Sequence, residues 1–321
     1  MSSRHLVDPE LWIGLEIMPT LTFSTEMLAA TRIAMTAMLA SRSVPANPAV
    51  ETTEQRVVGP DDNEIQLLVH RPRGAAGPLP AVLHIHGGGY VIGSAAMWVE
   101  SNQRTAADVG CVVVSVDYRL APETRHPGPV EDCWAALNWL HGEAETLGVD
   151  PARIAVMGES AGGGLAAALA LIARDRGGVS IAHQHLIYPM IDDRTSFRDP
   201  HPYSGEFVWT AESNRFGWTA LLGECAGSED VDLYGAAARA IDLTGLPSTY
   251  IAVGALDLFA DENIDYARRL LRSGVPTELH IYPGAFHGFE IATEAEVTRM
   301  AHGNSLAALR RALHPADKAR Q

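Results

Sequence analysis

A regular alternation of short β-type runs with stretches of helical spacing is the feature that most constrains the fold of this chain. After residue 50, runs rich in Val, Ile and other strand-forming residues are separated by Gly and Pro. Strands are expected near 55–58, 64–70, 81–86, 111–117, 153–157, 183–188, 249–254 and 278–282. Helical spacing is found between the later runs, at 97–109, 130–147, 161–175 and 262–273. Because helices that join parallel strands cover the sheet, the pattern predicts an α/β fold with a mostly parallel, eight-stranded sheet and helices on both faces.

Two segments depart from this alternation. Residues 1–50 carry apolar residues at helical spacing, which predicts helices. Residues 192–245 form a long stretch between two strands that contains Phe and Trp, which indicates an insertion folding over the strand ends. We therefore expect one catalytic domain, made of residues 51–191 and 246–321, and a helical cap assembled from the two departing segments.

The charge balance excludes nucleic acid as a partner. The 321-residue chain has 24 basic and 39 acidic residues, which gives a formal net charge of −15. Such a chain repels phosphate backbones and anionic lipid surfaces. Its 47% hydrophobic and 20% charged residues are typical of a globular protein with a large core and exclude a mainly disordered chain.

Cysteine usage and the N-terminal segment favour a cytoplasmic protein. Cys111, Cys133 and Cys225 are far apart and form no Cys-x-x-Cys pair, so we expect them to be reduced. The first residues lack the apolar core of a signal peptide. The apolar stretch at 27–40 contains Thr and Arg and is too short to span a bilayer. The sequence thus predicts a cytoplasmic protein without stable membrane insertion.

The stretch Gly158-Glu-Ser-Ala-Gly162 carries the strongest chemical signal. It has the pattern Gly-x-Ser-x-Gly and lies directly between an expected strand and an expected helix. A nucleophilic Ser160 on a sharp strand-to-helix turn needs flanking residues without side chains, and the helix N-terminus places partial positive charge near a developing oxyanion. A phosphate-binding loop is the competing interpretation. It is disfavoured because Ser160 stands where the dinucleotide fingerprint requires glycine, and no Gly-Lys-Ser/Thr occurs.

A second signal is the glycine triplet in His86-Gly-Gly-Gly89, which follows another expected strand. Consecutive glycines let backbone N–H groups turn toward one point, as an oxyanion hole requires. A plain tight turn explains an isolated glycine triplet equally well. The occurrence of the triplet upstream of Gly-x-Ser-x-Gly favours the oxyanion hole.

A serine nucleophile needs a histidine as general base. In α/β-hydrolases this histidine follows both the serine and the acid in the chain. Only His287 closely follows an expected strand, in a loop bracketed by glycines. The candidates after Ser160 are His183, His185, His201, His280, His287, His302 and His314.

The acid that orients the histidine is expected to be Asp257. It follows the strand expected at 249–254 and precedes His287 by thirty residues. Asp192 and Asp193 follow an earlier strand and remain alternatives. Asp261 and Glu262 fit the first turn of a helix better than a catalytic position.

These residues together resemble the hormone-sensitive lipase family of α/β-hydrolases, in its bacterial family IV esterase branch, over nearly the whole chain. The resemblance implies an α/β-hydrolase fold with a helical cap. It implies that the N–H groups of Gly88, Gly89 and Ala161 form the oxyanion hole, supported by His86, Gly87 and Glu159. The matching segments are His86–Gly89, Asp117–Glu123, Gly158–Gly162, Gly254–Glu262 with Asp257, and Phe286–Phe289 with His287.

The function implied is that of a serine carboxylesterase acting on small, short-chain esters through an acyl-enzyme, with no cofactor. Lactones, amides or aryl esters remain alternative substrates on the same residues. A pure ligand-binding module or a metallohydrolase is disfavoured. The pairs His84-x-His86 and His183-x-His185 lack the further ligand that would complete a zinc site, so no metal is expected. Relatives often pair through an edge strand, which implies a homodimer through residues 277–282.

Overall fold

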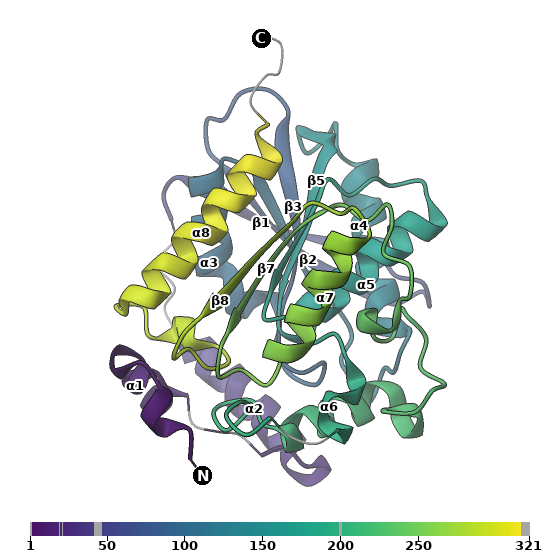
Figure 1. The fold of residues 1–321 in the computed structure, drawn as a ribbon. Coiled ribbons are helices and arrows are strands. Elements are labelled where there is room, and N and C mark those ends of the chain that lie inside the picture. Colours follow the sequence, from purple (N-terminus) through teal and green to yellow (C-terminus); the bar gives the residue numbers. More distant parts are fainter. Residues whose placement is uncertain (1, 19, 21, 42–46, 199–200, 316–321) are drawn as a thin grey trace.

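An eight-stranded sheet runs through the middle of the molecule in the computed structural model, which describes residues 2–18, 20, 22–41, 47–198 and 201–315 (Figure 1). The strand order is β1-β2-β4-β3-β5-β6-β7-β8. The strands are β1 (Val50–Val58), β2 (Glu64–Pro72), β3 (Leu79–Ile85), β4 (Val112–Asp117), β5 (Val149–Glu159), β6 (His183–Ile187), β7 (Ser248–Gly254) and β8 (Thr277–Tyr282). All eight expected strands are therefore confirmed, and β8 is an edge strand as expected.

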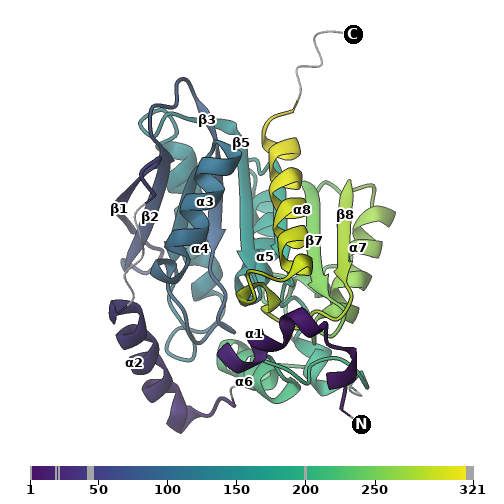
Figure 2. The same cartoon turned by 90° about the vertical axis from the view of Figure 1, so that its left-hand side faces the viewer.

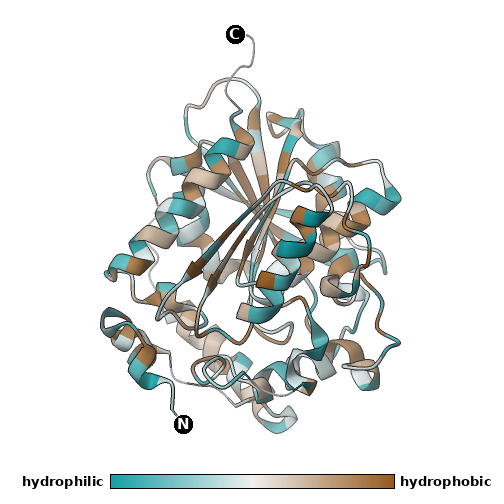
Figure 3. Cartoon of the chain, viewed as in Figure 1, coloured by the Kyte–Doolittle hydropathy of each residue, from teal (hydrophilic) through white to brown (hydrophobic). Residues whose placement is uncertain are grey.

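The direction of the strands follows the sequence pattern. β2 pairs antiparallel with both β1 and β4, and the pairs from β4 through β3 to β8 are all parallel. The central strands are buried on both faces, as in the run Val112–Val116. Figure 3 shows the same feature as brown strands between helices whose outer faces are teal. Burial on both faces explains why these strands are continuous apolar runs without alternation.

Helices cover both faces of the sheet (Figure 2). α3 (Val99–Val109) and α8 (Glu296–Leu313) contact one another on one face. The other face carries α4 (Gly128–Gly142), α5 (Ala161–Arg176) and α7 (Ala260–Arg272). The small residues of α5 let it pack closely on the sheet, and its residues 161–173 are all buried. The four expected helical stretches are confirmed.

The N-terminal segment and the 192–245 segment lie together below one end of the sheet (Figures 1 and 2). They contain α1 (Trp12–Ile17), α2 (Thr25–Ser41) and α6 (Ala211–Leu222). The Phe23 ring lies 5.7 Å from that of Trp209 and 6.1 Å from that of Phe216, so aromatic contacts join two segments far apart in sequence. The hydroxyl groups of Ser2 and Ser3 also donate hydrogen bonds to Glu206.

The described residues also form short 3-10 helices, at Arg4–Leu6, Pro9–Leu11, Ala95–Trp98, Asp193–Phe197, Gly223–Cys225, Ala237–Arg239 and Phe289–Ile291. Within the same ranges, the helices lack the length and apolar character needed to cross a membrane. The loops after β3, β5, β7 and β8 all leave the sheet at the end that faces α1 and α6, because the carboxyl ends of parallel strands meet at one edge.

Candidate active site

Ser160 lies on a sharp turn between β5 and α5. Its backbone is in an unusual region, with φ 55° and ψ −119°, which a non-glycine residue adopts only when its surroundings enforce it. The surroundings explain the flanking glycines. A Cβ at Gly162 would collide with the carbonyl oxygen of Ile85, and a Cβ at Gly158 would collide with the backbone of Gly162. The turn is further held by a 2.9 Å hydrogen bond from the Ser160 N–H to the Ile187 carbonyl.

Three side chains from three different loops form a continuous chain of hydrogen bonds. His287 Nε2 lies 3.0 Å from Ser160 Oγ, and His287 Nδ1 lies 2.8 Å from Asp257 Oδ2. The other oxygen of Asp257 accepts a 2.9 Å hydrogen bond from the Phe259 N–H, which fixes the carboxylate. In this arrangement the carboxylate holds the proton on Nδ1, so that Nε2 is free to accept the proton of the serine hydroxyl.

The three groups are shielded from water. Ser160, Asp257 and His287 are 6%, 1% and 7% exposed. Aromatic rings surround the imidazole: Tyr188 at 4.7 Å and Phe259 at 5.2 Å meet it edge-on. Hydrogen bonds between polar groups are stronger in such a water-poor environment than in solvent.

The glycine triplet forms a loop directly beside Ser160. Gly88 and Gly89 have φ of 123° and 59°, a backbone conformation that favours glycine. A Cβ on Gly87 would lie only 2.9 Å from the Glu159 carbonyl oxygen and 3.5 Å from Ser160 Cβ, which shows how closely the loop approaches the serine. The N–H groups of Gly88 and Gly89 make no hydrogen bond to any residue in the described ranges.

His86 holds this loop through neutral contacts. Its ring stacks on Tyr118 at 4.2 Å, and its Nδ1 lies 2.8 Å from the Gly87 carbonyl oxygen. The Tyr118 hydroxyl donates a 2.9 Å hydrogen bond to the His86 carbonyl. Burial lowers the pKa of His86 to about 3, so the ring stays uncharged at neutral pH. The histidine before the glycines therefore contacts the loop as an uncharged, stacked ring.

Glu159 connects the serine turn to the neighbouring strand. Its Oε2 lies 2.9 Å from Nε2 of the buried His84 on β3, whose Nδ1 in turn lies 2.8 Å from Ser115 Oγ. Asn102 on α3 also reaches His84, at 3.1 Å. His84 thus takes part in a polar network, and its side chain helps to fix the residue next to Ser160.

The alternative acids form ion pairs away from His287. Asp192 pairs with Arg194 at 2.7 Å, and Asp193 pairs with Arg239 at 2.7 Å. Glu262 is buried in the first turn of α7 and accepts hydrogen bonds from the N–H groups at 191 and 192. Of the acids weighed from the sequence, Asp257 is the one that lies next to His287.

The remaining histidine pair is structural. His183 and His185 lie on β6, where their rings bond to Ser248 and Ser305. Burial lowers the pKa of His183 to about 4 and that of His185 well below its usual value. Within the described ranges, no three His, Cys, Asp or Glu side chains are grouped as metal ligands.

The structure adds three residues whose place near His287 the sequence did not indicate. Tyr188 directly follows β6 and touches the imidazole edge-on. Trp209 lies 6.2 Å from the same ring and against Gly89, where a Cβ would collide with its indole. Glu290 lies three residues after His287 and interacts with Tyr188. Only Glu290 is close to His287 in the chain, so only its proximity to the imidazole could have been inferred from sequence spacing.

Comparison with known proteins decides the family. Residues 82–291 match a family model described as an alpha/beta hydrolase fold. Carboxylesterase NlhH of Mycobacterium tuberculosis is 36% identical over 271 residues, which cover 81% of this chain and 83% of the relative. This chain belongs to the hormone-sensitive lipase family of α/β-hydrolases. Another relative in this family, an arylesterase of Saccharolobus solfataricus, is 32% identical over 78% of the chain and 81% of its own length.

Solved structures agree with this family assignment. A bacterial heroin esterase superposes with a TM-score of 0.89 and 41% identity, covering 97% of this hydrolase and 99% of its own chain. Esterase LipW from Mycobacterium marinum gives a TM-score of 0.85 and 32% identity, covering 97% and 98%. The expected fold and the expected class of reaction are therefore confirmed: this α/β-hydrolase is a serine carboxylesterase.

Proposed function

We propose that Ser160, His287 and Asp257 form the catalytic triad of this carboxylesterase. The continuous hydrogen-bond chain, 3.0 Å from serine to histidine and 2.8 Å from histidine to aspartate, carries the proposal. Ser160 Oγ attacks the ester carbonyl carbon while His287 takes its proton, and the protonated His287 then donates that proton to the leaving alcohol. Water activated by the same histidine releases the carboxylic acid from the acyl-enzyme.

The oxyanion formed in both steps is proposed to bind the N–H groups of Gly88, Gly89 and Ala161. Two observations support this role: the loop approaches Ser160 closely, and Ala161 is the first residue of α5, whose N-terminus carries partial positive charge. His86, Gly87 and Glu159 are proposed to keep these donors in place through the contacts described above.

A fluorophosphonate reagent tests the nucleophile directly. The reagent should modify the protein once, and peptide mapping should place the adduct on Ser160, because this hydroxyl has a histidine within 3.0 Å in the elbow turn. Ser305, whose hydroxyl also lies 2.8 Å from a histidine, serves as an internal comparison and should stay unlabelled. An unlabelled Ser160 in an enzyme that hydrolyses esters would exclude the proposed mechanism.

Residues 1–50 and 192–245 are proposed to form a helical cap over this site. The contacts of Phe23 with Trp209 and Phe216 support a single unit, although a few residues of both segments lie outside the described ranges. Trp209 is 6% exposed and packs against Gly89, so it limits the space beside Ser160. This contact supports short-chain, small-molecule esters as substrates.

Truncation of this tryptophan should broaden the accepted chain length. Trp209→Ala is expected to raise kcat/KM for a p-nitrophenyl decanoate relative to the butyrate by about tenfold, since a few methylenes gain contact with a pocket. Trp139 on α4, a half-buried tryptophan away from the site, provides the matched control. Trp139→Ala should leave the ratio of the two esters unchanged. If Trp209→Ala left the ratio of the two esters unchanged, Trp209 would not limit the substrate pocket.

A cytoplasmic location and a homodimer are also proposed. Cys111, Cys133 and Cys225 form no disulfide, which supports a reducing compartment. Edge strand β8 has a free side along which a second copy could extend the sheet, and Ile281 is 43% exposed on this strand. Light scattering of the purified enzyme measures the molar mass and tests the dimer.

A further inference from the structure

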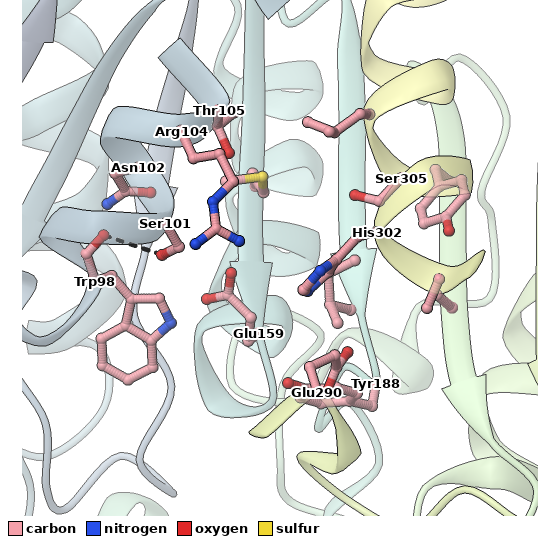
Figure 4. A pocket seen from close by; sticks show the side chains of 16 residues that line it. Trp98, Ser101, Asn102, Arg104, Thr105, Glu159, Tyr188, Glu290, His302 and Ser305 are labelled. Atoms are coloured by element: carbon pink, nitrogen blue, oxygen red, sulfur yellow. Dashed lines mark hydrogen bonds between the residues drawn. The ribbon is translucent and has the colours of Figure 1, made fainter. Parts of the chain in front are cut away.

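A cavity of about 210 Å³ lies behind the serine turn, between α3 and α8 (Figure 4). It is on the sheet face that carries these two helices, and the carboxyl ends of β5, β6 and β7 contribute to its wall. Figure 4 shows Tyr188 and Glu290 side by side at one end, below Glu159 and His302. The residues that line it include Tyr188, Glu290, Glu159, Arg104 and His302.

Glu290 has an unusual environment in this wall. Its carboxyl interacts with the Tyr188 hydroxyl, while its Oε2 atom is buried and has no hydrogen-bond partner among the described residues. A buried carboxylate oxygen without a partner is costly, so such a group is expected to have a role. The proposed catalytic steps do not use it.

Tyr188 links this carboxyl to the proposed base. Its ring meets the His287 ring edge-on at 4.7 Å. Its backbone has φ 33° and its N–H donates a 2.6 Å hydrogen bond to the Ala252 carbonyl, so the neighbouring strand holds the main chain from which the ring projects. Glu290 therefore lies next to an aromatic ring that contacts the imidazole.

We infer that Glu290 is a positioning residue that acts on His287 through Tyr188. When Glu290 is ionised, it stabilises the imidazolium form of His287 that develops in the transition state. The inference rests on the proposed role of His287. An ionised Glu290 would add negative charge on the side of the imidazole held by Tyr188, and negative charge stabilises a nearby imidazolium.

The ionisation of Glu290 falls in an accessible pH range. Burial, together with the negative charges of Glu159 and Asp257, raises its pKa to about 8, although the Tyr188 hydroxyl acts in the opposite direction. Arg104 from α3 and His302 from α8 face it across the cavity, and burial lowers the pKa of His302, which leaves it neutral in this range. The carboxyl is thus neutral below about pH 7 and charged above about pH 9.

The pH dependence of kcat/KM tests the inference. The wild-type rate should first rise with pH because a serine hydrolase requires its general base uncharged. It should then rise a second time near pH 8, by about threefold, as the nearby charge forms. Glu290→Gln keeps the shape and hydrogen-bonding capacity of the neutral acid. It should match the wild type within about twofold below pH 7 and lack the second rise.

Tyr188→Phe provides an independent variant that keeps the ring against His287. Since the Tyr188 hydroxyl lowers the pKa of Glu290, its removal should move the second rise to higher pH. Cys225 is an exposed thiol on another segment of the chain. Cys225→Ser should therefore retain the second rise, as should Glu294→Gln, which removes an exposed carboxyl from the segment that carries Glu290.

Other pH profiles of kcat/KM would contradict either the role of Glu290 or the proposed catalytic triad. A single-step wild-type profile, or a second rise that persists in Glu290→Gln, overturns the inference. An equal loss at every pH in Glu290→Gln assigns the residue a structural role only. A failure of the proposed catalytic triad would give a different result from a failure of the Glu290 inference. A variant that lacks the Ser160 hydroxyl would then hydrolyse esters as fast as the wild type.

Discussion

Ser160→Ala should lower kcat/KM for p-nitrophenyl butyrate by about 10⁴- to 10⁶-fold, the range seen when a serine hydrolase loses its nucleophile. The hydroxyl is the atom that forms the acyl-enzyme, and no other serine of the described ranges bonds to His287. Residual hydrolysis would reflect binding and oxyanion stabilisation alone. Stopped assays at high enzyme concentration measure so low a rate.

The chain offers a matched control for this substitution. Ser305 Oγ lies 2.8 Å from His185 Nε2, so Ser305→Ala removes a serine–histidine hydrogen bond of similar length that does not involve His287. Its activity should stay within about twofold of the wild type, as expected for a residue away from the chemistry. If Ser160→Ala folded and kept most of its activity, the proposed mechanism would be wrong.

Asp257→Asn should lower kcat by about 10³- to 10⁴-fold, as loss of the orienting acid does in other serine hydrolases. An asparagine of the same shape presents an N–H group where Asp257 Oδ2 now accepts from His287 Nδ1. The imidazole would then carry its proton on Nε2, which could no longer accept the proton of Ser160. Steady-state hydrolysis together with fluorophosphonate labelling rates measures the loss, and both should fall.

Asp192→Asn is the control that separates the two acids weighed from the sequence. Asp192 is a buried carboxylate that follows a strand, as Asp257 is, and its side chain is 4% exposed. Unlike Asp257, it pairs with Arg194. Its replacement should alter activity by less than about threefold, because this carboxylate lies apart from His287. A larger loss in Asp192→Asn than in Asp257→Asn would reverse the proposed assignment.

The sequence predicted the elements of this fold because their signals are local. Each parallel strand is a continuous apolar run bounded by glycine or proline, and each connecting helix has its own spacing. Ser160, Asp257 and His287 are expected from the Gly-x-Ser-x-Gly motif, from the chain order of serine, acid and histidine, and from their positions after strands, whose carboxyl ends a parallel sheet brings to one edge.

The contacts around the site could not be predicted in the same way, because they join distant segments. The bond of Glu159 to His84 spans 75 positions, and the packing of Trp209 on Gly89 depends on how an irregular segment folds. No periodicity specifies such pairs. The apolar spacing of residues 25–41 predicted a helix correctly but not its surroundings, since Met27, Ile33 and Met38 are more than half exposed.

The positions of the three hydrogen-bonded side chains in the sheet imply that activity is lost before the core unfolds. In the monomer, before any pairing of β8 with a second copy, His287 follows a strand that has a neighbour on one side only, whereas Ser160 follows β5 in the middle of the sheet. Strands at the margin of a sheet can separate in partial unfolding events while the centre stays folded. Detachment of β8 would carry the histidine away from an intact serine turn. The esterase would then be silenced by heat or denaturant before its core melts, and it would recover when a single strand docks again.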